Sequence, residues 1–354
     1  MTASFGEGHN AAARGIRDGL VRVSADTEVE VHDLFAEVYG ALNKIVGKAY
    51  IGLINRWPRS WGSVYRWLDR QQNFDRGFLW LHPVKNRLAR LLVRFDPDVI
   101  VSVFPAYPYL LKAILGSQPR YQNVVVVTDS ITVNAIWYRA RADYILVPNE
   151  QSAAVVRATG VDPELIRTIG FPVNPVFADL PQDRQSPAAG NRRVLYMIHA
   201  GTLSAPETVR RLLALDIHLT VTVGRDEKLR QTIAAIPRSQ DKIDIVGWTS
   251  ELPRLLSANH LLIGKAGGAM VQETIAARCP MIINHIVSGQ EEGNAQLILE
   301  TNSGGVAKSP EEVARAVENA FADDAKQWRE WTKNISALSK PRASLDIAKF
   351  LLSI

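Results

Sequence analysis

The strongest constraint on the fold is an alternation of short apolar, β-branched runs with stretches of helical spacing. Eleven such runs follow one another along the chain. This alternation is typical of βα units, which build parallel sheets in α/β proteins. We therefore expect strands at residues 28–34, 99–104, 123–128, 144–147, 166–169, 194–199, 219–223, 243–246, 260–264, 281–284 and 305–307.

A polar segment divides these runs into two groups. Residues 181–193 are rich in Pro, Gly and Ala and show no apolar period, as expected of an exposed linker. The chain has 354 residues, which is enough for two domains. We expect one doubly wound domain at residues 1–180 and a second at 194–340. Apolar positions at helical spacing predict a C-terminal helix within residues 341–354.

Composition excludes several classes of protein. No run of 18 apolar residues occurs, so the sequence predicts no membrane-spanning helix. Cys279 is the single cysteine, which excludes an internal disulfide and a zinc site built from paired cysteines. The sequence does not begin with a signal-peptide pattern, so we expect a cytoplasmic protein.

The positive charge is concentrated in one segment. The whole chain carries a net charge of +5, whereas residues 40–95 contain eleven Lys and Arg against two Asp. The same segment holds four of the eight tryptophans: Trp57, Trp61, Trp67 and Trp80. A basic, Trp-rich stretch suits an anionic membrane surface. A solvated helical hairpin is the alternative, and no recognisable module supports binding of nucleic acid.

The first candidate site is the loop at the start of the chain. Gly6 and Gly8 flank Glu7, and His9 follows just before an Ala-rich helix that we expect to begin near Asn10. An imidazole at this place can take a proton from a hydroxyl group, although a structural turn in which His9 caps the helix is the alternative. Because only three residues precede the loop, we expect a missing or truncated first strand and a native start upstream.

Other candidates follow later strands, where doubly wound sheets bind their ligands. Asp129 comes directly after the run at 123–128 and can orient His9 or bind an acceptor hydroxyl; the alternative is that it caps the next helix. Thr202 lies in the turn after residues 194–199, where a phosphate fits. The Asp-Pro-Asp motif at residues 96–98 precedes a strand, so we interpret it as a turn and expect no metal site there.

The most informative motif is the glycine-rich turn at residues 265–268, between an expected strand and an expected helix. Amides at the start of such a helix can hold a diphosphate, and a glutamate one turn further can accept both hydroxyls of a ribose. Polar residues near 290 suit the hydroxyls of a hexose. An ordinary βα unit is the alternative. The candidate donor-binding residues are Thr202, Gly247, Trp248, Lys265, Gly267, Gly268, Ala269, Glu273, Gln290, Glu291 and Asn294.

These motifs resemble the monogalactosyldiacylglycerol synthase family, which includes the bacterial processive diacylglycerol glucosyltransferases. The resemblance is carried by SFGEGHNAAA, ADYILVPNE and, above all, GKAGGAMVQE with GQEEGNA downstream. The peptidoglycan GlcNAc transferase is a more distant resemblance. Three features depart from the family pattern. Asn134 stands near a place where a histidine is common, and Ala269 stands where a hydroxyl residue is common. The first loop of the second domain, His199-Ala200-Gly201-Thr202, is usually richer in glycine.

The resemblance implies a GT-B fold, with two Rossmann-like domains facing across a cleft and a C-terminal helix that crosses back to the first. It implies an inverting hexosyltransferase with a UDP-sugar donor, a diacylglycerol-type lipid acceptor, and neither a metal nor another cofactor. His9 becomes the candidate base near the acceptor. Gly267, Gly268 and Glu273 become contacts to diphosphate and ribose, and Gln290 and Glu291 contacts to the sugar. We expect a peripheral enzyme at the inner face of the cell membrane.

Three alternatives remain from the sequence. One is a UDP-GlcNAc transferase that acts on a polyprenyl-linked lipid. Another is a nucleotide-sugar 2-epimerase, which shares this architecture and needs no membrane segment. The third is a non-catalytic membrane-binding relative.

Overall fold

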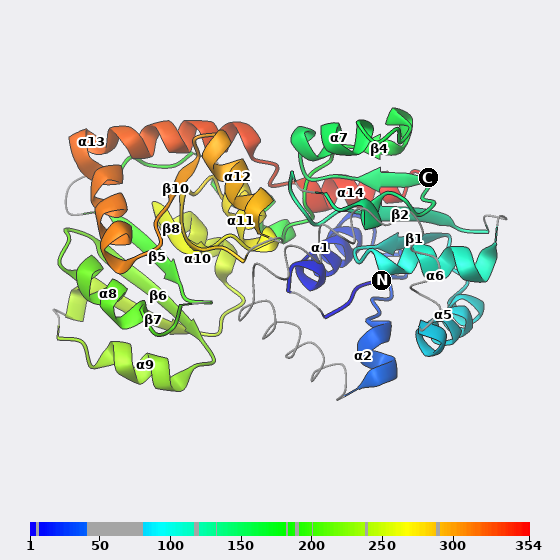
Figure 1. Ribbon diagram of the computed structural model, residues 1–354, viewed down its shortest axis with the longest axis horizontal. Coiled ribbons are helices and arrows are strands. Elements are labelled where there is room, and N and C mark those ends of the chain that lie inside the picture. The colour runs from blue at the N-terminus through cyan, green and yellow to red at the C-terminus, as the bar shows by residue number, and fades with distance from the viewer. Residues whose placement is uncertain are drawn as a thin grey trace. The chain divides into compact units, whose positions relative to one another are not determined.

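The computed structural model contains two compact α/β units (Figure 1). Unit 1 comprises Met1–Pro175, Val287–Gly293 and Arg342–Ile354, and unit 2 comprises Val176–Ile286 and Asn294–Pro341. The domain boundaries given above stay a prediction, because compact units need not be independent domains. The structure describes residues 1–4, 7–40, 81–116, 120–131, 133–181, 183–187, 191–199, 201–237, 240–287 and 291–354.

Unit 1 is built on a parallel sheet in which each strand pairs with the next in sequence. Most valines and isoleucines of these strands are buried, as expected of a sheet covered on both faces. The strands are β1 (Val99–Ser102), β2 (Gln122–Val126), β3 (Tyr144–Leu146) and β4 (Ile166–Arg167). The helices are α1 (Glu7–Val23), α2 (Leu34–Tyr39), α5 (His82–Phe95), α6 (Ala106–Leu115), η2 (Ala135–Trp137), α7 (Glu150–Arg157), η3 (Pro163–Leu165), η4 (Pro175–Asp179), which runs into unit 2, and α14 (Ala343–Leu351).

Residues 1–3 form an extended stub beside β1. The amide of Val103 donates to the carbonyl of Met1 at 3.0 Å, and the amide of Thr2 donates to the carbonyl of His32 at 2.9 Å. The stub therefore lies between β1 and the segment around residue 32. The strand expected at 28–34 was wrong: residues 28–33 form no ladder and Leu34 begins α2. A partner of three residues is too short to complete a ladder along that segment.

Small residues let α1 approach the rest of unit 1 closely. A Cβ at Gly15 would lie 1.9 Å from the carbonyl oxygen of Pro172, and one at Gly19 would lie 2.5 Å from that of Ser344. The Ser344 hydroxyl donates to the carbonyl of Val173. The C-terminal helix α14 therefore packs on α1, which carries His9 in its first turn.

Unit 2 contains a larger parallel sheet with the strand order β10-β9-β8-β5-β6-β7. Because β5 has β6 on one side and β8 on the other, the topological switch point lies between β5 and β8. Its strands are β5 (Arg193–Met197), β6 (His218–Gly224), β7 (Ile243–Gly247), β8 (Leu261–Lys265), β9 (Met281–His285) and β10 (Gly304–Val306). Its helices are α8 (Ala205–Leu213), α9 (Glu227–Ala234), η5 (Gln240–Lys242), α10 (Leu252–Ala258), α11 (Gly268–Ala276), α12 (Glu292–Glu300), whose first two residues are grouped with unit 1, and α13 (Pro310–Leu338).

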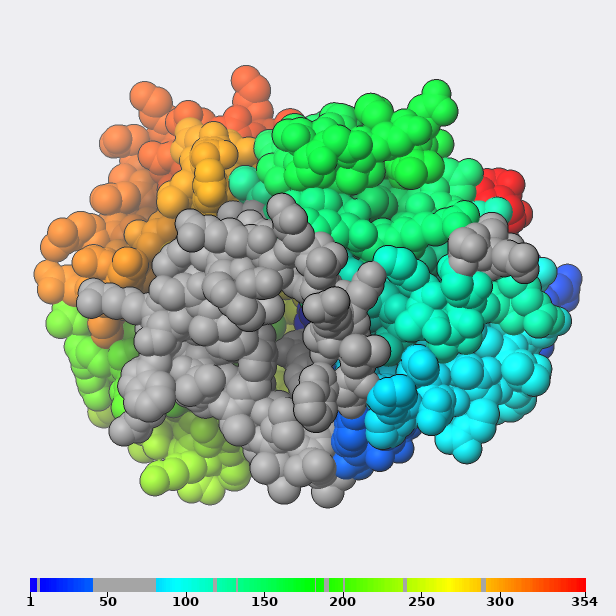
Figure 2. Space-filling view, turned by 45° about the vertical axis from the view of Figure 1, so that its right-hand side comes forward, coloured from blue at the N-terminus to red at the C-terminus, as the bar shows by residue number. Residues whose placement is uncertain are grey.

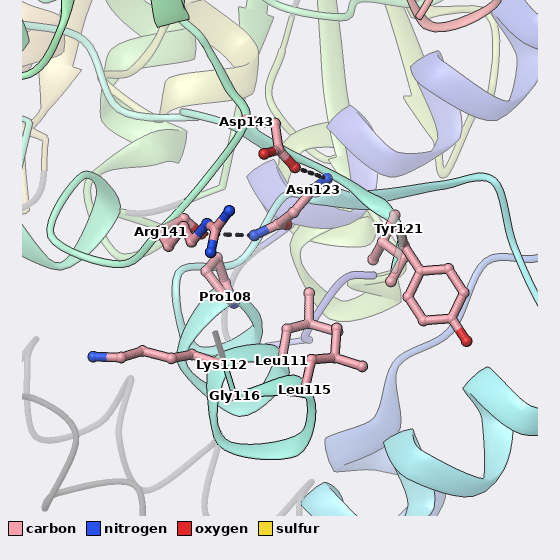
Figure 3. Close-up of a pocket in the computed structure, with 10 residues that line it drawn as sticks. Pro108, Leu111, Lys112, Leu115, Gly116, Tyr121, Asn123, Arg141 and Asp143 are labelled. Carbon is pink, nitrogen blue, oxygen red and sulfur yellow. Dashed lines mark hydrogen bonds between the residues drawn. The ribbon is translucent and has the colours of Figure 1, made fainter. Parts of the chain in front are cut away.

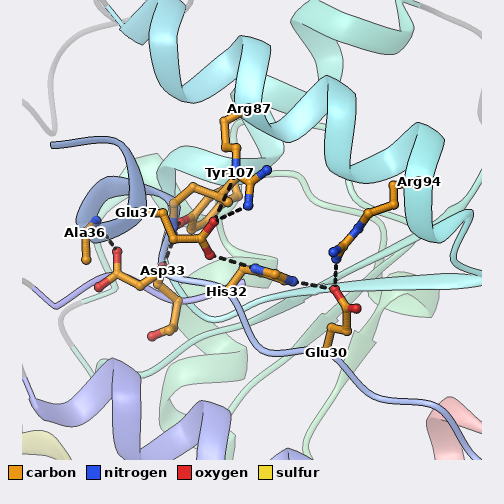
Figure 4. Close-up of polar contacts among 10 residues, drawn as sticks. Glu30, His32, Asp33, Ala36, Glu37, Arg87, Arg94 and Tyr107 are labelled. Atoms are coloured by element: carbon orange, nitrogen blue, oxygen red, sulfur yellow. Dashed lines mark hydrogen bonds and ion pairs between the residues drawn. The ribbon is translucent and has the colours of Figure 1, made fainter. Parts of the chain in front are cut away.

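A cluster of paired charges joins α2 and α5, which lie side by side on the surface of unit 1 (Figures 1 and 2). We name the residues Glu30, His32, Glu37, Arg87 and Arg94 the charge cluster (Figure 4). His32 Nδ1 lies 2.6 Å from Glu37 Oε1, and its Nε2 lies 2.6 Å from Glu30 Oε2. Arg87 donates to Glu37 at 2.9 Å, and Arg94 donates to Glu30. Every charge in this cluster therefore has an opposite partner.

Candidate active site

His9 lies at the carboxyl-terminal edge of the unit 1 sheet. The helix α1 begins at Glu7 rather than near Asn10, so Gly8 and His9 form part of its first turn. His9 Nδ1 is 3.1 Å from Thr128 Oγ1. The ring of Phe104 packs edge-on at 5.2 Å between centroids, and that of Trp137 lies at 6.0 Å. Segments that follow β1 and β2 thus meet His9 where α/β sheets bind ligands.

The surroundings of His9 keep its imidazole neutral. Burial lowers the pKa of His9 from 6.5 to about 4, and a hydrogen bond to the backbone of Val103 acts in the opposite direction. A neutral imidazole has one unprotonated nitrogen at pH 7, so it can accept a proton from a hydroxyl group. His9 therefore has the protonation state that a general base requires.

Asp129 lies beside the Trp137 indole, as His9 does. Its side chain contacts the indole, which was not among the contacts expected from the sequence. The Trp137 indole Nε1 donates to Asp129 Oδ2 at 2.7 Å. Burial raises the pKa of Asp129 from 3.8 to about 6, and the hydrogen bond from Trp137 partly opposes this rise. The side chain of Thr128 lies within hydrogen-bond distance of the His9 ring. Of the two roles expected for Asp129, binding an acceptor hydroxyl fits this geometry better than orienting His9.

Trp137 is held in place by a short helical turn. Asn134 Oδ1 accepts from the amide of Ile136 at 3.1 Å, and the amide of Trp137 donates to the carbonyl of Asn134 at 3.0 Å. Asn134 and Trp137 are both buried. Asn134, which departs from the family pattern, therefore caps the turn that places the indole.

In unit 2, the glycine-rich turn leads from β8 into α11 next to the switch point. Lys265 is the last residue of β8, and Gly267 is the N-cap of α11, whose first two residues are Gly268 and Ala269. No side chain caps this helix start among the described residues, so its first amides point outward as donors. Asn294 is buried and donates from Nδ2 to the carbonyl of Ala266 at 3.0 Å, which fixes the turn.

The remaining donor candidates of unit 2 follow neighbouring strands. Glu273 is half-buried in the second turn of α11. Thr202 is exposed in the turn after β5, and Gly247 ends β7. Trp248 is 65% exposed, and the Arg225 guanidinium lies 5.3 Å from the centre of its ring. These groups all lie at the carboxyl-terminal edge of the sheet.

Some sequence candidates fall elsewhere. Glu291 is buried, and its Oε2 accepts from the amide of Val287 at 3.0 Å. It belongs to the segment Val287–Gly293 that is grouped with unit 1, whereas Asn294 belongs to unit 2. The candidates outside the described residues are Gly6, Gln290, Trp57, Trp61, Trp67 and Trp80.

The sequence reading missed three contacts of these sites. Phe104 follows β1, Arg225 follows β6 directly, and Thr128 stands next to Asp129. The rule that ligands bind after the carboxyl ends of parallel strands selects these positions too. The rule selects positions, but it does not tell which side chains meet there.

A small cavity in unit 1 is separate from these sites (Figure 3). It has a volume of about 40 Å³ and is lined by residues of α6 and by Tyr121, Asn123, Arg141 and Asp143. Asn123 donates from Nδ2 to the carbonyl of Arg141 at 2.8 Å, and its backbone N–H donates to Asp143 Oδ2 at 2.7 Å. The cavity lies near the amino-terminal ends of β2 and β3 and has room for only a few waters. It is therefore too small for a sugar nucleotide.

Two kinds of feature are absent from the described residues. No three His, Cys, Asp or Glu side chains gather as a metal-binding group there. None of the helices in those same residues combines the length and apolar character needed to cross a membrane.

Comparison with known proteins identifies relatives of the chain. Residues 9–173 match the family described as monogalactosyldiacylglycerol (MGDG) synthase. The chain is 26% identical over 379 residues to a probable monogalactosyldiacylglycerol synthase 2, chloroplastic, of Oryza sativa subsp. japonica. That match covers 99% of this chain and 78% of the rice protein. The resemblance inferred from the motifs is therefore confirmed.

Solved structures share the fold. The S. aureus MnaA–UDP co-structure has a TM-score of 0.57 at 12% identity, covering 76% of this chain and 80% of that one. The crystal structure of Acinetobacter baumannii MurG has a TM-score of 0.56 at 12% identity, covering 77% of this chain and 78% of that one. These likenesses confirm the expected GT-B fold class.

Proposed function

This chain is a relative of the monogalactosyldiacylglycerol synthases, and from that premise we propose that it is a glycosyltransferase. It moves a hexose from a UDP-sugar to a diacylglycerol-type lipid. The observation that carries the proposal is the match to such a synthase over 99% of the chain, which includes both His9 and the turn before α11. Residues 1–180 serve the acceptor and residues 194–340 the donor, with 181–193 as the linker.

On the acceptor side, His9 is the general base. The acceptor oxygen attacks the anomeric carbon, the bond from that carbon to the diphosphate oxygen breaks, and the configuration inverts. The hydroxyl proton passes to the neutral imidazole of His9, and the electron pair leaves with UDP. Before the attack, when the lipid binds, its hydroxyl donates its single hydrogen to the carboxylate of Asp129, which holds the acceptor in the site; the same hydrogen then turns to His9 for the transfer. The pKa of His9 near 4, caused by burial, supports the neutral state that this step needs.

On the donor side, unit 2 binds the UDP-sugar at the edge of its sheet. The first amides of α11 stabilise the negative charge that develops on the leaving diphosphate, without a divalent ion. Glu273 accepts hydrogen bonds from the ribose hydroxyls, and Trp248 contacts the uracil. Gln290 and Glu291 contact the hexose. The start of α11, which no described side chain caps, supports the diphosphate assignment.

We also propose a peripheral place for the enzyme at the inner face of the cell membrane, where its lipid acceptor is found. The basic, Trp-rich residues 40–95 support this, because positive side chains bind anionic headgroups and tryptophans favour the interface. Within the described part of this segment, α5 carries four basic side chains and no acidic one, and two of the four, Arg87 and Arg94, are paired in the charge cluster.

The test is release of UDP from UDP-galactose, UDP-glucose or UDP-GlcNAc in the presence of anionic vesicles with and without diacylglycerol. We expect release that depends on diacylglycerol, a glycolipid product with inverted configuration, and activity that persists in EDTA. Release only with a polyprenyl-linked lipid, epimerised nucleotide sugar without lipid, or no turnover of any donor would contradict the proposal. Loss of activity in EDTA would overturn the metal-free step alone.

A further inference from the structure

We propose that Trp137 is a positioning residue that fixes the carboxylate of Asp129 against the acceptor hydroxyl through a single indole hydrogen bond. The inference rests on the proposed function, because it assigns the residue that prepares one group of that site. Trp137 acts through Asp129 and needs no contact with the substrate itself.

The geometry fixes the direction of the indole N–H. Trp137 is 2% exposed, and the turn capped by Asn134 holds its backbone. The N–H donates to Oδ2 of Asp129 at 2.7 Å. A carboxylate has two oxygens, so this bond orients the group while Oδ1 stays available to a substrate. Asp129 is half-buried as a residue.

The acceptor of this hydrogen bond distinguishes Trp137 from the other buried tryptophans that the structure describes. In unit 2, Trp328 donates to the carbonyl of His260 at 2.7 Å, and Trp331 donates to Asn302 Oδ1 at 3.2 Å. Both acceptors are neutral, which suffices to satisfy a buried indole N–H. Trp137 instead donates to an acid, and burying a carboxylate has a free-energy cost that a carbonyl acceptor would avoid. Such a costly arrangement indicates a functional rather than a structural purpose.

The charges around Asp129 determine what loss of the indole bond would do. Burial raises the pKa of Asp129, and the hydrogen bond from the Trp137 N–H lowers it. His9 is the titratable side chain whose ring lies near the Trp137 indole, and it is neutral at pH 7. Removing the N–H therefore leaves burial unopposed, and the carboxylate is both less ionised and less well oriented.

The experiment measures UDP release on diacylglycerol vesicles from pH 5 to 8.5 for four variants: Trp137→Phe, Asp129→Asn, the double variant and Trp331→Phe. Trp137→Phe should move the acidic limb of kcat/KM for the lipid upward by about one pH unit and lower kcat/KM about 10-fold at pH 7. The KM for the UDP-sugar should not change. In the Asp129→Asn background, the same substitution should cost less than about 2-fold.

Trp331→Phe is the matched control, since it removes an indole N–H from a neutral acceptor, and its pH profile should equal that of the wild type. An unmoved acidic limb in Trp137→Phe, or an equal loss in both backgrounds, would overturn the inference. If the wild-type protein releases no UDP with any lipid, the proposed function fails instead.

A second measurement needs neither activity nor a stable Trp137→Phe variant. In wild-type protein labelled with 5-fluorotryptophan, one ¹⁹F resonance should titrate with pH, and that titration should disappear in Asp129→Asn. Absence of any such resonance would overturn the inference even if the enzyme is active.

Discussion

Two histidines of unit 1 have opposite surroundings. His32 has a carboxylate 2.6 Å from each ring nitrogen, from Glu30 and Glu37. His9 instead has a hydroxyl group at Nδ1, from Thr128, and aromatic rings around it. The charge cluster around His32 satisfies each charge with its opposite. The site around His9 removes polar groups from water without supplying counter-charges.

The difference separates a structural role from a chemical one. Exposed ion pairs contribute little to stability. Burial without a counter-charge moves the pKa of His9 down and that of Asp129 up, which costs stability but prepares both for proton chemistry. We therefore expect substitutions in the His9 site to change catalysis and those in the charge cluster to change stability slightly.

The largest expected effect is on turnover. His9→Ala should lower kcat for UDP release at least about 100-fold, because it removes the proton acceptor. Binding of UDP, measured by calorimetry, should be unchanged, since the residues proposed to contact the diphosphate, the ribose and the uracil lie in unit 2. The control His32→Gln should retain kcat within about 2-fold. Comparable losses in the two variants would break the contrast between the histidines.

The next effect is a gain of stability on loss of an active-site charge. A carboxyl whose pKa rises from 3.8 to about 6 on folding destabilises the protein as pH increases through that window, by about 3 kcal/mol when complete. Asp129→Asn should therefore raise the free energy of unfolding at pH 7.5 by up to about 3 kcal/mol. The gain should vanish below pH 3.8, where both states bind the proton. Denaturant titrations across pH measure this, and a destabilised variant at pH 7.5 would contradict the account.

A smaller effect concerns the donor. Glu273→Gln should weaken UDP binding about 10-fold, because an amide accepts the two ribose hydroxyls less well than a carboxylate. Calorimetry with UDP measures the change, and 2′,3′-dideoxy-UDP should bind both proteins equally. Glu311→Gln, on the exposed start of α13, is the control. Equal UDP affinity in all three proteins would remove Glu273 from the ribose site.

The smallest effect is in the charge cluster. The pKa of Glu30 is lowered chiefly by its hydrogen bond with His32 and further by Arg94. Its contribution to stability is therefore present above its ordinary pKa of 4.5 and is lost as the pH falls through the lowered value. Glu30→Gln should reduce Tm at pH 7 by at most about 3 °C, and the difference should shrink at low pH and in 1 M salt. A large decrease would show that the cluster does more than pair charges.

Much of the fold could be predicted because parallel strands are apolar on both faces. Ten of the eleven expected strands are present, with their ends displaced by no more than two residues. The exception is the run at residues 28–34, which has the composition of a strand. Whether such a run pairs also depends on the segment beside it, here residues 1–3, and the composition of the run does not reveal that segment. The early start of α1 at Glu7 was missed because Gly8 reads as a loop residue.

The candidate site could be predicted only in part. The rule for carboxyl ends selected His9 and Asp129, and the structure places both beside Trp137. Which side chain meets which depends on tertiary contacts, so the pairing of Thr128 with His9 was not visible in the sequence. The grouping of Glu291 with unit 1 likewise follows from the path of the chain rather than from any local pattern.

The most direct test of the account is the pH dependence of kcat/KM for diacylglycerol in the wild-type protein, which reports the ionisations of the free enzyme. Burial sets the pKa of Asp129 to about 6 and that of His9 to about 4. We predict an acidic limb near pH 6 that Asp129→Asn abolishes. A profile that stays flat down to pH 5, or one with the same limb in both proteins, would contradict the account. Its central claim is that Asp129 and His9, buried beside Trp137 without a counter-charge, act on the lipid hydroxyl.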